Sequence, residues 1–424
     1  MKSKIKIAIL FSAVVAVFST SCNDDLPGKY KITDGTPTIY YIRPANAASQ
    51  DVLLTGALLG ESICIVGDNL TSIQELYFND KRAILNINLI TKNTLFVNVP
   101  RERADVITDK IYFINQAGEK TDYDFIVRMP APVISSIKCE FVPEGQDVVL
   151  YGDYFFDDDP VNAPISVKVG TYSVPPQDIV DVKKTQLTFK APPVEITGKI
   201  SVTSIHGAGA KSKQIFRDTR GIIVDFDSPF VAGWGVIGAV ESAPEYSISG
   251  KYMRFEGAIS ESNAGAWGQM DAMSFHYWGE DNGIPEGNLF SSDPATSIFK
   301  FEANVVNPWS ALAMQIFFFH QGDTNGAMWE YAKNPSGADY TNYPRGLWRP
   351  WLSGANVVPY TSGGWVTVSI PIKDFNLNSQ GGKAAIDMPS TFGALTMIVF
   401  RGGVLGLPCN PKILIDNIRV VPAE

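Results

Sequence analysis

The residues best suited to chemistry are aromatic side chains in the loops of the C-terminal half. All eight tryptophans of the 424-residue chain follow residue 220. Exposing a loop tryptophan to water costs free energy, so its ring either packs against the core or serves as a flat platform for a ligand. The apolar face of a β-linked glucose stacks well on an indole, while its hydroxyls need polar partners. The predicted sugar-binding residues are Trp278, Trp329, Tyr331, Trp348 and Trp351, with Glu280, Asp281 and Glu330 as polar partners.

The other tryptophans have different settings. Trp365 opens an apolar strand, which predicts a core position, and Trp309 follows a proline, which predicts a loop side chain packed on the core. Trp234 and Trp267 fit either a core or a ligand-contact role. We therefore expect at least two of Trp278, Trp329, Trp348 and Trp351 to form the platform.

Composition excludes several classes of protein. The formal net charge is −9 and no basic run is present, which argues against nucleic-acid binding. The three histidines are scattered and form no cluster with cysteine. The sequence therefore offers few of the residues that a zinc site or a histidine-based nucleophile relay needs. We predict no catalytic activity, no required cofactor and a monomer.

Two alternatives stay open. A glycoside hydrolase would need two carboxylates across the scissile bond. The chain has candidates, but no local motif pairs them, and Glu302 alternates along a strand with Phe299 and Phe301, as a structural polar residue does. A protein-binding surface adhesin is the second alternative, and it would leave the loop tryptophans without a role. The candidate carboxylates are Glu256, Glu280, Asp281, Glu302, Glu330 and Asp387.

The N-terminus has the features of a targeting segment. Three lysines precede the apolar stretch 7–18, which is too short to span a bilayer, and Ser19-Thr20-Ser21 precede Cys22. We predict a signal peptide over 1–21. The arrangement resembles a bacterial lipobox, with Ser19 departing from the usual leucine, and the resemblance implies lipidation of Cys22 and a lipid anchor. Asn23-Asp24-Asp25 resemble the export signal of Bacteroidota surface lipoproteins. An ordinary secretion signal is the alternative, and 22–35 is the predicted linker.

An internal repeat follows the linker. Two segments share an entry strand, an apolar strand ending in Gly-Asp, and a later strand closing on proline. The Gly67-Asp68 and Gly152-Asp153 pairs lie 85 residues apart, and Pro100 and Pro192 lie 92 apart. Short alternating strands with turn residues at the breaks predict two antiparallel sandwiches. The two copies resemble the immunoglobulin-like IPT/TIG domain over 36–128 and 129–218. We expect them to act as spacers, and binding of a partner is the alternative.

The remaining residues, 219–424, predict a larger β-sandwich of the jelly-roll kind. Strand-like runs such as 299–305, 365–370 and 412–420 alternate with long loops rich in Gly, Asn and Pro. Asp225 and Asp416 lie on the expected first and last strands and are weak candidates for a structural calcium site. The fold class is therefore all-β: two tandem immunoglobulin-like sandwiches followed by a larger glycan-binding sandwich.

The whole chain resembles the B-type surface glycan-binding proteins of Bacteroidota polysaccharide-utilisation systems. The resemblance rests on the leader, the tandem IPT/TIG-like domains and the strand runs 300–305, 364–375 and 414–420, which look like those of carbohydrate-binding jelly rolls. It implies an outer-membrane, cell-surface lipoprotein that captures a plant β-glucan, either xyloglucan or mixed-linkage glucan, for uptake. It also implies a neighbouring TonB-dependent importer with a SusD-like lid protein and a surface endoglucanase.

Overall fold

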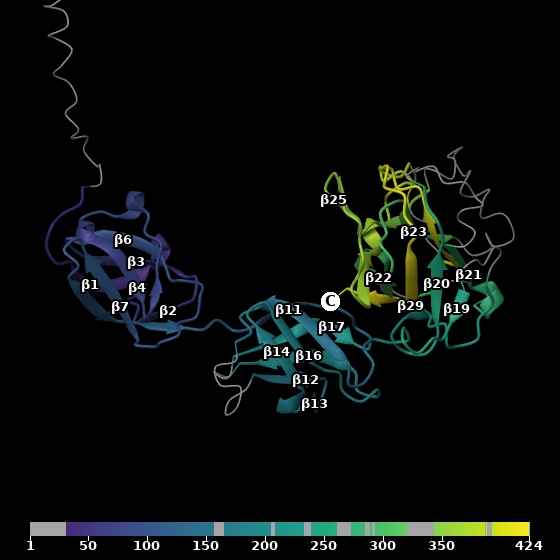
Figure 1. The fold of residues 1–424 in the computed structure, drawn as a ribbon, viewed down its shortest axis with the longest axis horizontal. Coiled ribbons are helices and arrows are strands. Elements are labelled where there is room, and N and C mark those ends of the chain that lie inside the picture. Colours follow the sequence, from purple (N-terminus) through teal and green to yellow (C-terminus); the bar gives the residue numbers. More distant parts are fainter. Residues whose placement is uncertain are drawn as a thin grey trace, which may run out of the picture. The chain divides into compact units, whose positions relative to one another are not determined.

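The computed structural model describes most of the chain after its first 30 residues. The described residues are 31–156, 165–204, 208–232, 239–260, 273–284, 289–290, 293–319, 343–385, 387 and 392–423. They form strands joined by loops and three-residue 3₁₀ helices, which confirms the predicted all-β class (Figure 1). No helix in this part of the chain combines the length and apolar character that a membrane span requires. The 3₁₀ helices are η1 (Ala47–Ser49), η2 (Leu70–Ser72), η3 (Ile87–Leu89), η4 (Pro176–Asp178), η6 (Glu280–Asn282), η7 (Pro294–Thr296) and η9 (Ile372–Asp374).

The chain divides into two compact units, one ending at Pro130 and the other starting at Ala131. The first unit is a sandwich of a three-stranded sheet, β1-β3-β6, and a four-stranded sheet, β5-β4-β7-β8, with a parallel pair, β2-β9. Its strands are β1 (Thr38–Pro44), β2 (Gly56–Leu58), β3 (Ser62–Asp68), β4 (Ile73–Phe78), β5 (Lys81–Arg82), β6 (Thr94–Asn98), β7 (Lys110–Asn115), β8 (Lys120–Asp124) and β9 (Ile126–Arg128).

The second unit begins with another sandwich, made of the sheets β10-β11-β15-β14 and β13-β12-β16-β17. Its core is formed by inward residues of alternating strands, such as Val148 and Leu150 on β11 and Val167 and Val169 on β12. The strands are β10 (Val133–Ile137), β11 (Asp147–Asp153), β12 (Ser166–Val169), β13 (Tyr172–Ser173), β14 (Ile179–Lys183), β15 (Gln186–Lys190), β16 (Gly198–Thr203) and β17 (Gly209–Phe216).

The repeated Gly-Asp pair has the same structural role in both sandwiches. Each glycine lies at a bulge where two strands approach closely: a Cβ on Gly67 would lie 2.0 Å from the Thr38 carbonyl oxygen, and one on Gly152 would lie 1.8 Å from that of Val133. Each following aspartate accepts a hydrogen bond from the next backbone N–H, in a residue with positive φ. The pair therefore ends the strand and starts a sharp turn, which is why it recurs.

The rest of the second unit is the larger sandwich. One sheet has the order β19-β20-β29-β22-β27, with β18 also paired to β29, and the other is β21-β28-β23-β24. Both sheets contribute alternate side chains to one large core. The strands are β18 (Ile222–Val224), β19 (Ala239–Glu241), β20 (Tyr252–Glu256), β21 (Ser274–Trp278), β22 (Ser297–Val305), β23 (Ala313–Phe319), β24 (Gly346–Trp348), β25 (Leu352–Ser353), β26 (Asn356–Val357), β27 (Val366–Pro371), β28 (Ala394–Phe400) and β29 (Lys412–Pro422).

A buried network of charges joins the immunoglobulin-like part of this unit to the larger sandwich. Glu140 accepts from the Lys300 ammonium at 2.7 Å and from the Arg419 guanidinium at 2.8 Å. Arg419 also pairs with Glu302 at 2.7 Å, and all four side chains are at most 4% exposed. Thr367 donates its hydroxyl to Glu302 and accepts from the backbone N–H of Glu140. The two sandwiches of residues 131–424 are therefore joined through a shared polar core.

Candidate glycan-binding site

The sheet β21-β28-β23-β24 has two different faces. Because side chains alternate along a strand, Met314, Ile316 and Phe318 of β23 enter the main core, while Phe317 and Phe319 lie on the opposite, outer face. On that outer face they form a second apolar cluster with Tyr343, Ala394, Ile398 and Phe400. The outer face thus carries a second, buried apolar cluster, each of whose buried members is at most 3% exposed.

Trp278 is the last residue of β21 and lies on the outer face. It pairs in register with Ala394 of β28 and packs, half-buried, against the second cluster. Within the described part of the chain its indole Nε1 is buried without a hydrogen-bond partner. An unpaired buried donor costs about 1–3 kcal/mol and is an exception among buried polar groups.

The structure brings Glu280 and Asp281 next to this tryptophan. They lie in η6, which starts one residue after Gly279, and both are exposed. The turn is held by Asn282, whose amide nitrogen donates to the carbonyl oxygens of Trp278 and Val231, both at 2.8 Å, and whose oxygen accepts from the Val231 N–H. The aromatic ring and two carboxylates are therefore held on one short, clamped turn.

Trp348 and Trp351 take a different place from the one predicted. Trp348, on edge strand β24, faces the main core, with its ring 5.5 Å from Phe301 and 5.4 Å from Trp309. Trp351 is fully buried and donates its Nε1 hydrogen to the Leu312 carbonyl at 2.8 Å. A buried ring offers no face to a sugar, so Trp351 is corrected from a platform residue to a core residue. The three-residue strand β24 is too short for its inward register to be visible in the sequence.

The remaining predicted residues cannot be placed on this face. Trp329, Glu330, Tyr331 and the lipidation candidate Cys22 lie outside the described residues. Of the predicted site, the described part of the chain brings together Trp278, Glu280 and Asp281.

Two tryptophans outside the predicted site also have informative positions. Trp309 is fully buried, and its Nε1 donates to the Ala311 carbonyl at 2.5 Å. Trp365, predicted as a core residue, is only half-buried and packs against the core of the preceding immunoglobulin-like sandwich. The strand pattern identified its apolar neighbours correctly, but the residue lies just before β27, where two domains meet.

The buried titratable groups of the larger sandwich are held in structural roles. Burial lowers the pKa of His276 to about 4, and its Nδ1 lies 2.8 Å from the Thr396 hydroxyl. Burial raises the pKa of Glu302, although Arg419 opposes the shift, and both carboxylate oxygens are hydrogen-bonded. Glu302 therefore lacks the access to solvent that a glycosidase carboxylate needs.

Asp225 and Asp416, the calcium candidates, bond to different groups. Asp225 accepts from the backbone and hydroxyl of Ser228, and Asp416 accepts from the Ser249 hydroxyl and the Asn417 N–H. Burial raises the pKa of Asp416 to about 8. No group of three or more metal-binding side chains occurs among the described residues.

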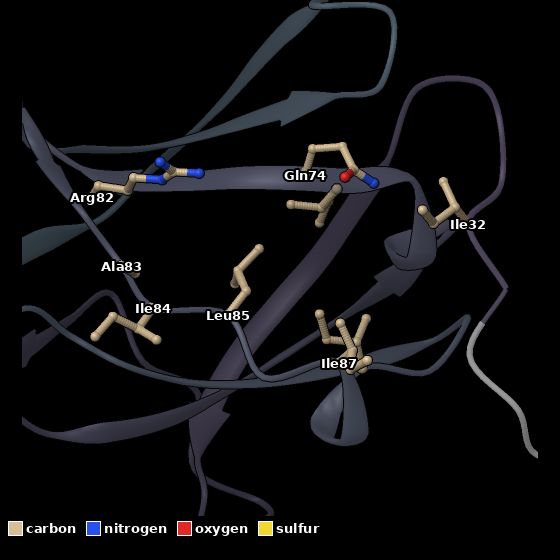
Figure 2. A pocket seen from close by; sticks show the side chains of 9 residues that line it. Ile32, Gln74, Arg82, Ala83, Ile84, Leu85 and Ile87 are labelled. Carbon is tan, nitrogen blue, oxygen red and sulfur yellow. The ribbon is translucent and has the colours of Figure 1, made fainter.

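A hollow on the first unit lacks the features of a sugar site. It has a volume of about 480 Å³ and lies beside β4 and β5, with Ile32, Leu85 and Ile87 on its walls (Figure 2). None of its nine lining residues is aromatic, and Arg82, its one charged side chain, pairs with Glu75 at 3.1 Å. Stacking on a flat ring is therefore impossible there.

In sequence and fold the chain is similar to known surface glycan-binding proteins. The family model "Surface glycan-binding protein B xyloglucan binding domain" matches residues 216–422. The crystal structure of the surface glycan-binding protein PbSGBP-B from Prevotella bryantii is 32% identical, with a TM-score of 0.68, and the match covers 93% of this chain and all of that one. An IPT/TIG domain-containing protein of Bacteroides ovatus is 28% identical over 198 residues, 44% of this chain and 39% of that protein.

The fold and the comparisons thus define the class: surface glycan-binding proteins built from β-sandwiches. The chain belongs to the B-type surface glycan-binding proteins. The family resemblance, the IPT/TIG-like domains and the sandwich fold predicted from the sequence are confirmed.

Proposed function

We propose that this protein is a non-catalytic lipoprotein that captures a plant β-glucan at the cell surface and presents it for uptake. The observation that carries the proposal is the match of residues 216–422 to a xyloglucan-binding domain, combined with the position of Trp278 on the outer sheet face. Xyloglucan is the first candidate, and mixed-linkage β-glucan is the second.

In this proposal a glucan chain lies at the end of β21, where the half-buried Trp278 ring borders the outer-face cluster. The Trp278 ring stacks on the apolar face of a glucose unit, and Glu280 and Asp281 accept hydrogen bonds from its hydroxyls. The clamp made by Asn282 holds these groups before the ligand arrives, which lowers the entropy cost of binding. No acid and base pair is used, so the chain binds glucan without cleaving it.

Binding and hydrolysis are separated by one set of measurements on the protein. Affinity electrophoresis and calorimetry with xyloglucan and barley β-glucan should show tight binding, and an assay for new reducing ends should show none. Trp278→Ala should weaken binding at least about tenfold, because a central aromatic contact typically carries 2 kcal/mol or more. Tyr40→Ala, which removes an exposed ring of the first unit, is the matched control and should bind normally.

Each alternative has its own outcome. Retained affinity in a folded Trp278→Ala variant would refute the outer-face site. New reducing ends would support a glycoside hydrolase, and the absence of any glucan binding would support a protein-binding adhesin.

The anchor and the partners form the second part of the proposal. Cys22 is the predicted lipidation site, so the protein is anchored in the outer membrane and works beside a TonB-dependent importer with a SusD-like lid. Labelling cells with a radioactive fatty acid should mark the wild-type protein and leave Cys22→Ala unmarked. Protease added to intact cells should degrade the wild-type protein if it is surface-exposed.

A further inference from the structure

A crevice lies where the immunoglobulin-like sandwich of the second unit meets the larger one. Its volume is about 730 Å³, within the range of about 300–1,000 Å³ typical of small-molecule sites. Phe141, Gln146 and Val149 line one wall, and Glu245, Tyr246 and Trp365 line the other. This crevice is separate from the outer sheet face around Trp278.

The two walls are tied to each other by polar contacts. The Lys138 ammonium donates to the Gly363 carbonyl at 2.8 Å, and the Thr367 N–H donates to the Lys138 carbonyl at 2.9 Å. Beneath them lies the buried charge network around Glu140. The crevice is therefore pre-formed, so ligand binding does not carry the entropy cost of ordering its walls.

Trp365 presents a fixed aromatic surface to this crevice. Its Nε1 donates to the Tyr246 carbonyl at 2.8 Å, and its ring meets Tyr252 edge-on, with centroids 6.2 Å apart and planes at 70°. The side chain remains half-buried rather than buried. An indole held in one orientation at the wall of a hollow is suited to stacking on a flat ligand face.

The polar groups around the ring suit an uncharged, hydroxyl-rich ligand. Gln146 and Glu245 are exposed at the rim, and Asn304 lies deeper. The charged groups nearby are already engaged, since Lys138 bonds to a carbonyl oxygen and Asp147 pairs with Lys190 at 2.7 Å. A flat aromatic wall with amide and carboxylate groups at its edge is the combination that a sugar ring requires.

We propose that this crevice is a second glycan-binding site that takes a short segment of the same neutral glucan, stacked on Trp365 and hydrogen-bonded by Gln146 and Glu245. The inference rests on the proposed function and deepens it. Two sites on one compact unit raise the affinity for a long polysaccharide above that of either site, while a short oligosaccharide occupies each site independently.

The test is a calorimetric titration of the full chain with a xyloglucan heptasaccharide, carried to millimolar concentration, and with the polymer. The wild type should bind two heptasaccharides per chain. The rim variant Gln146→Ala/Glu245→Ala and the outer-face variant Trp278→Ala should each bind one, and their combination should bind none. The rim variant should also bind the polymer at least about threefold more weakly, because one site then holds the polymer instead of two.

The matched control is Glu144→Ala, an exposed carboxylate of the same loop that does not line the crevice, and it should bind like the wild type. Trp365→Phe is a second crevice variant. It retains a ring for packing but loses the larger indole face and its hydrogen bond to Tyr246, so it should weaken binding in the crevice. One heptasaccharide per wild-type chain, with the rim variant and control indistinguishable, overturns this inference and leaves the outer-face site intact. No binding by any variant or by the wild type overturns the proposed function as well.

Discussion

Removing Glu140 should destabilise the second unit severely. Its carboxylate is 2% exposed and is the acidic partner of the Lys300 ammonium, which is itself 4% exposed. Glu140→Ala would leave that ammonium buried without a carboxylate and would remove one of the two carboxylates around Arg419. Breaking a buried ion pair by removing one partner costs about 3–5 kcal/mol, a large part of a typical stability of about 5–15 kcal/mol.

The assay is differential scanning calorimetry of the whole chain. A loss of this size should lower the melting temperature of the second unit by about 5–8 °C, given the entropy of unfolding expected for its length. The first unit is a separate compact body, so its transition should stay in place and serve as an internal reference. Because Glu140 joins the two sandwiches of the second unit, we expect them to unfold in one transition in the wild type.

Two further variants decide whether the network is the cause. Glu144→Ala removes an exposed acid from the same loop and should change stability by less than about 0.5 kcal/mol. Glu140→Leu/Lys300→Met replaces one buried pair with apolar groups while leaving Arg419 paired to Glu302, and it should recover most of the loss. A shift below about 2 °C for Glu140→Ala, or independent melting of the two sandwiches in the wild type, would refute the reasoning.

Two other predictions concern a buried acid and a repeated glycine. The pKa of Asp416 is about 8 in the folded protein, against a reference value of 3.8, so the folded state holds a proton that the unfolded state releases. The protonated Asp416 carboxyl contributes its full stabilisation below about pH 4. As the pH rises from there towards 8, the free energy of unfolding falls by up to about 1.4 kcal/mol per pH unit. Asp416→Asn should reduce the dependence of the free energy of unfolding on pH, measured by urea unfolding from pH 5 to 9. The same pH dependence in the variant and the wild type would contradict this prediction. Gly152→Ala would place a Cβ 1.8 Å from the Val133 carbonyl oxygen and should cost more than about 2 kcal/mol. Gly145→Ala, whose new Cβ meets nothing within 4 Å, should cost only about 1 kcal/mol for its positive φ, and equal losses would refute the close-approach argument.

Sequence reasoning was most successful where the signal is local. The Gly-Asp repeat, the alternating strands and the closing prolines identified two similar sandwiches, because each feature reflects a steric requirement within a few residues. Glu302 was also interpreted correctly as a structural residue from its alternation with Phe299 and Phe301. For the tryptophans, loop-like surroundings were a poorer guide, since Trp351 lies in a polar stretch and is nevertheless fully buried.

The sequence by itself determined the class of fold, the family and the concentration of aromatic rings in the last domain. The tertiary structure decided which of those rings enter the core and which lie on the outer face of the sheet. Trp278 and Trp348 lie on strands of one sheet, but their registers point them to opposite faces, and a one-residue shift reverses such a choice. The structure also paired Glu140 with Arg419, 279 residues away. Buried charges need partners, and here the fold supplies one from a distant part of the chain, so this pairing joins the second immunoglobulin-like sandwich to the larger sandwich.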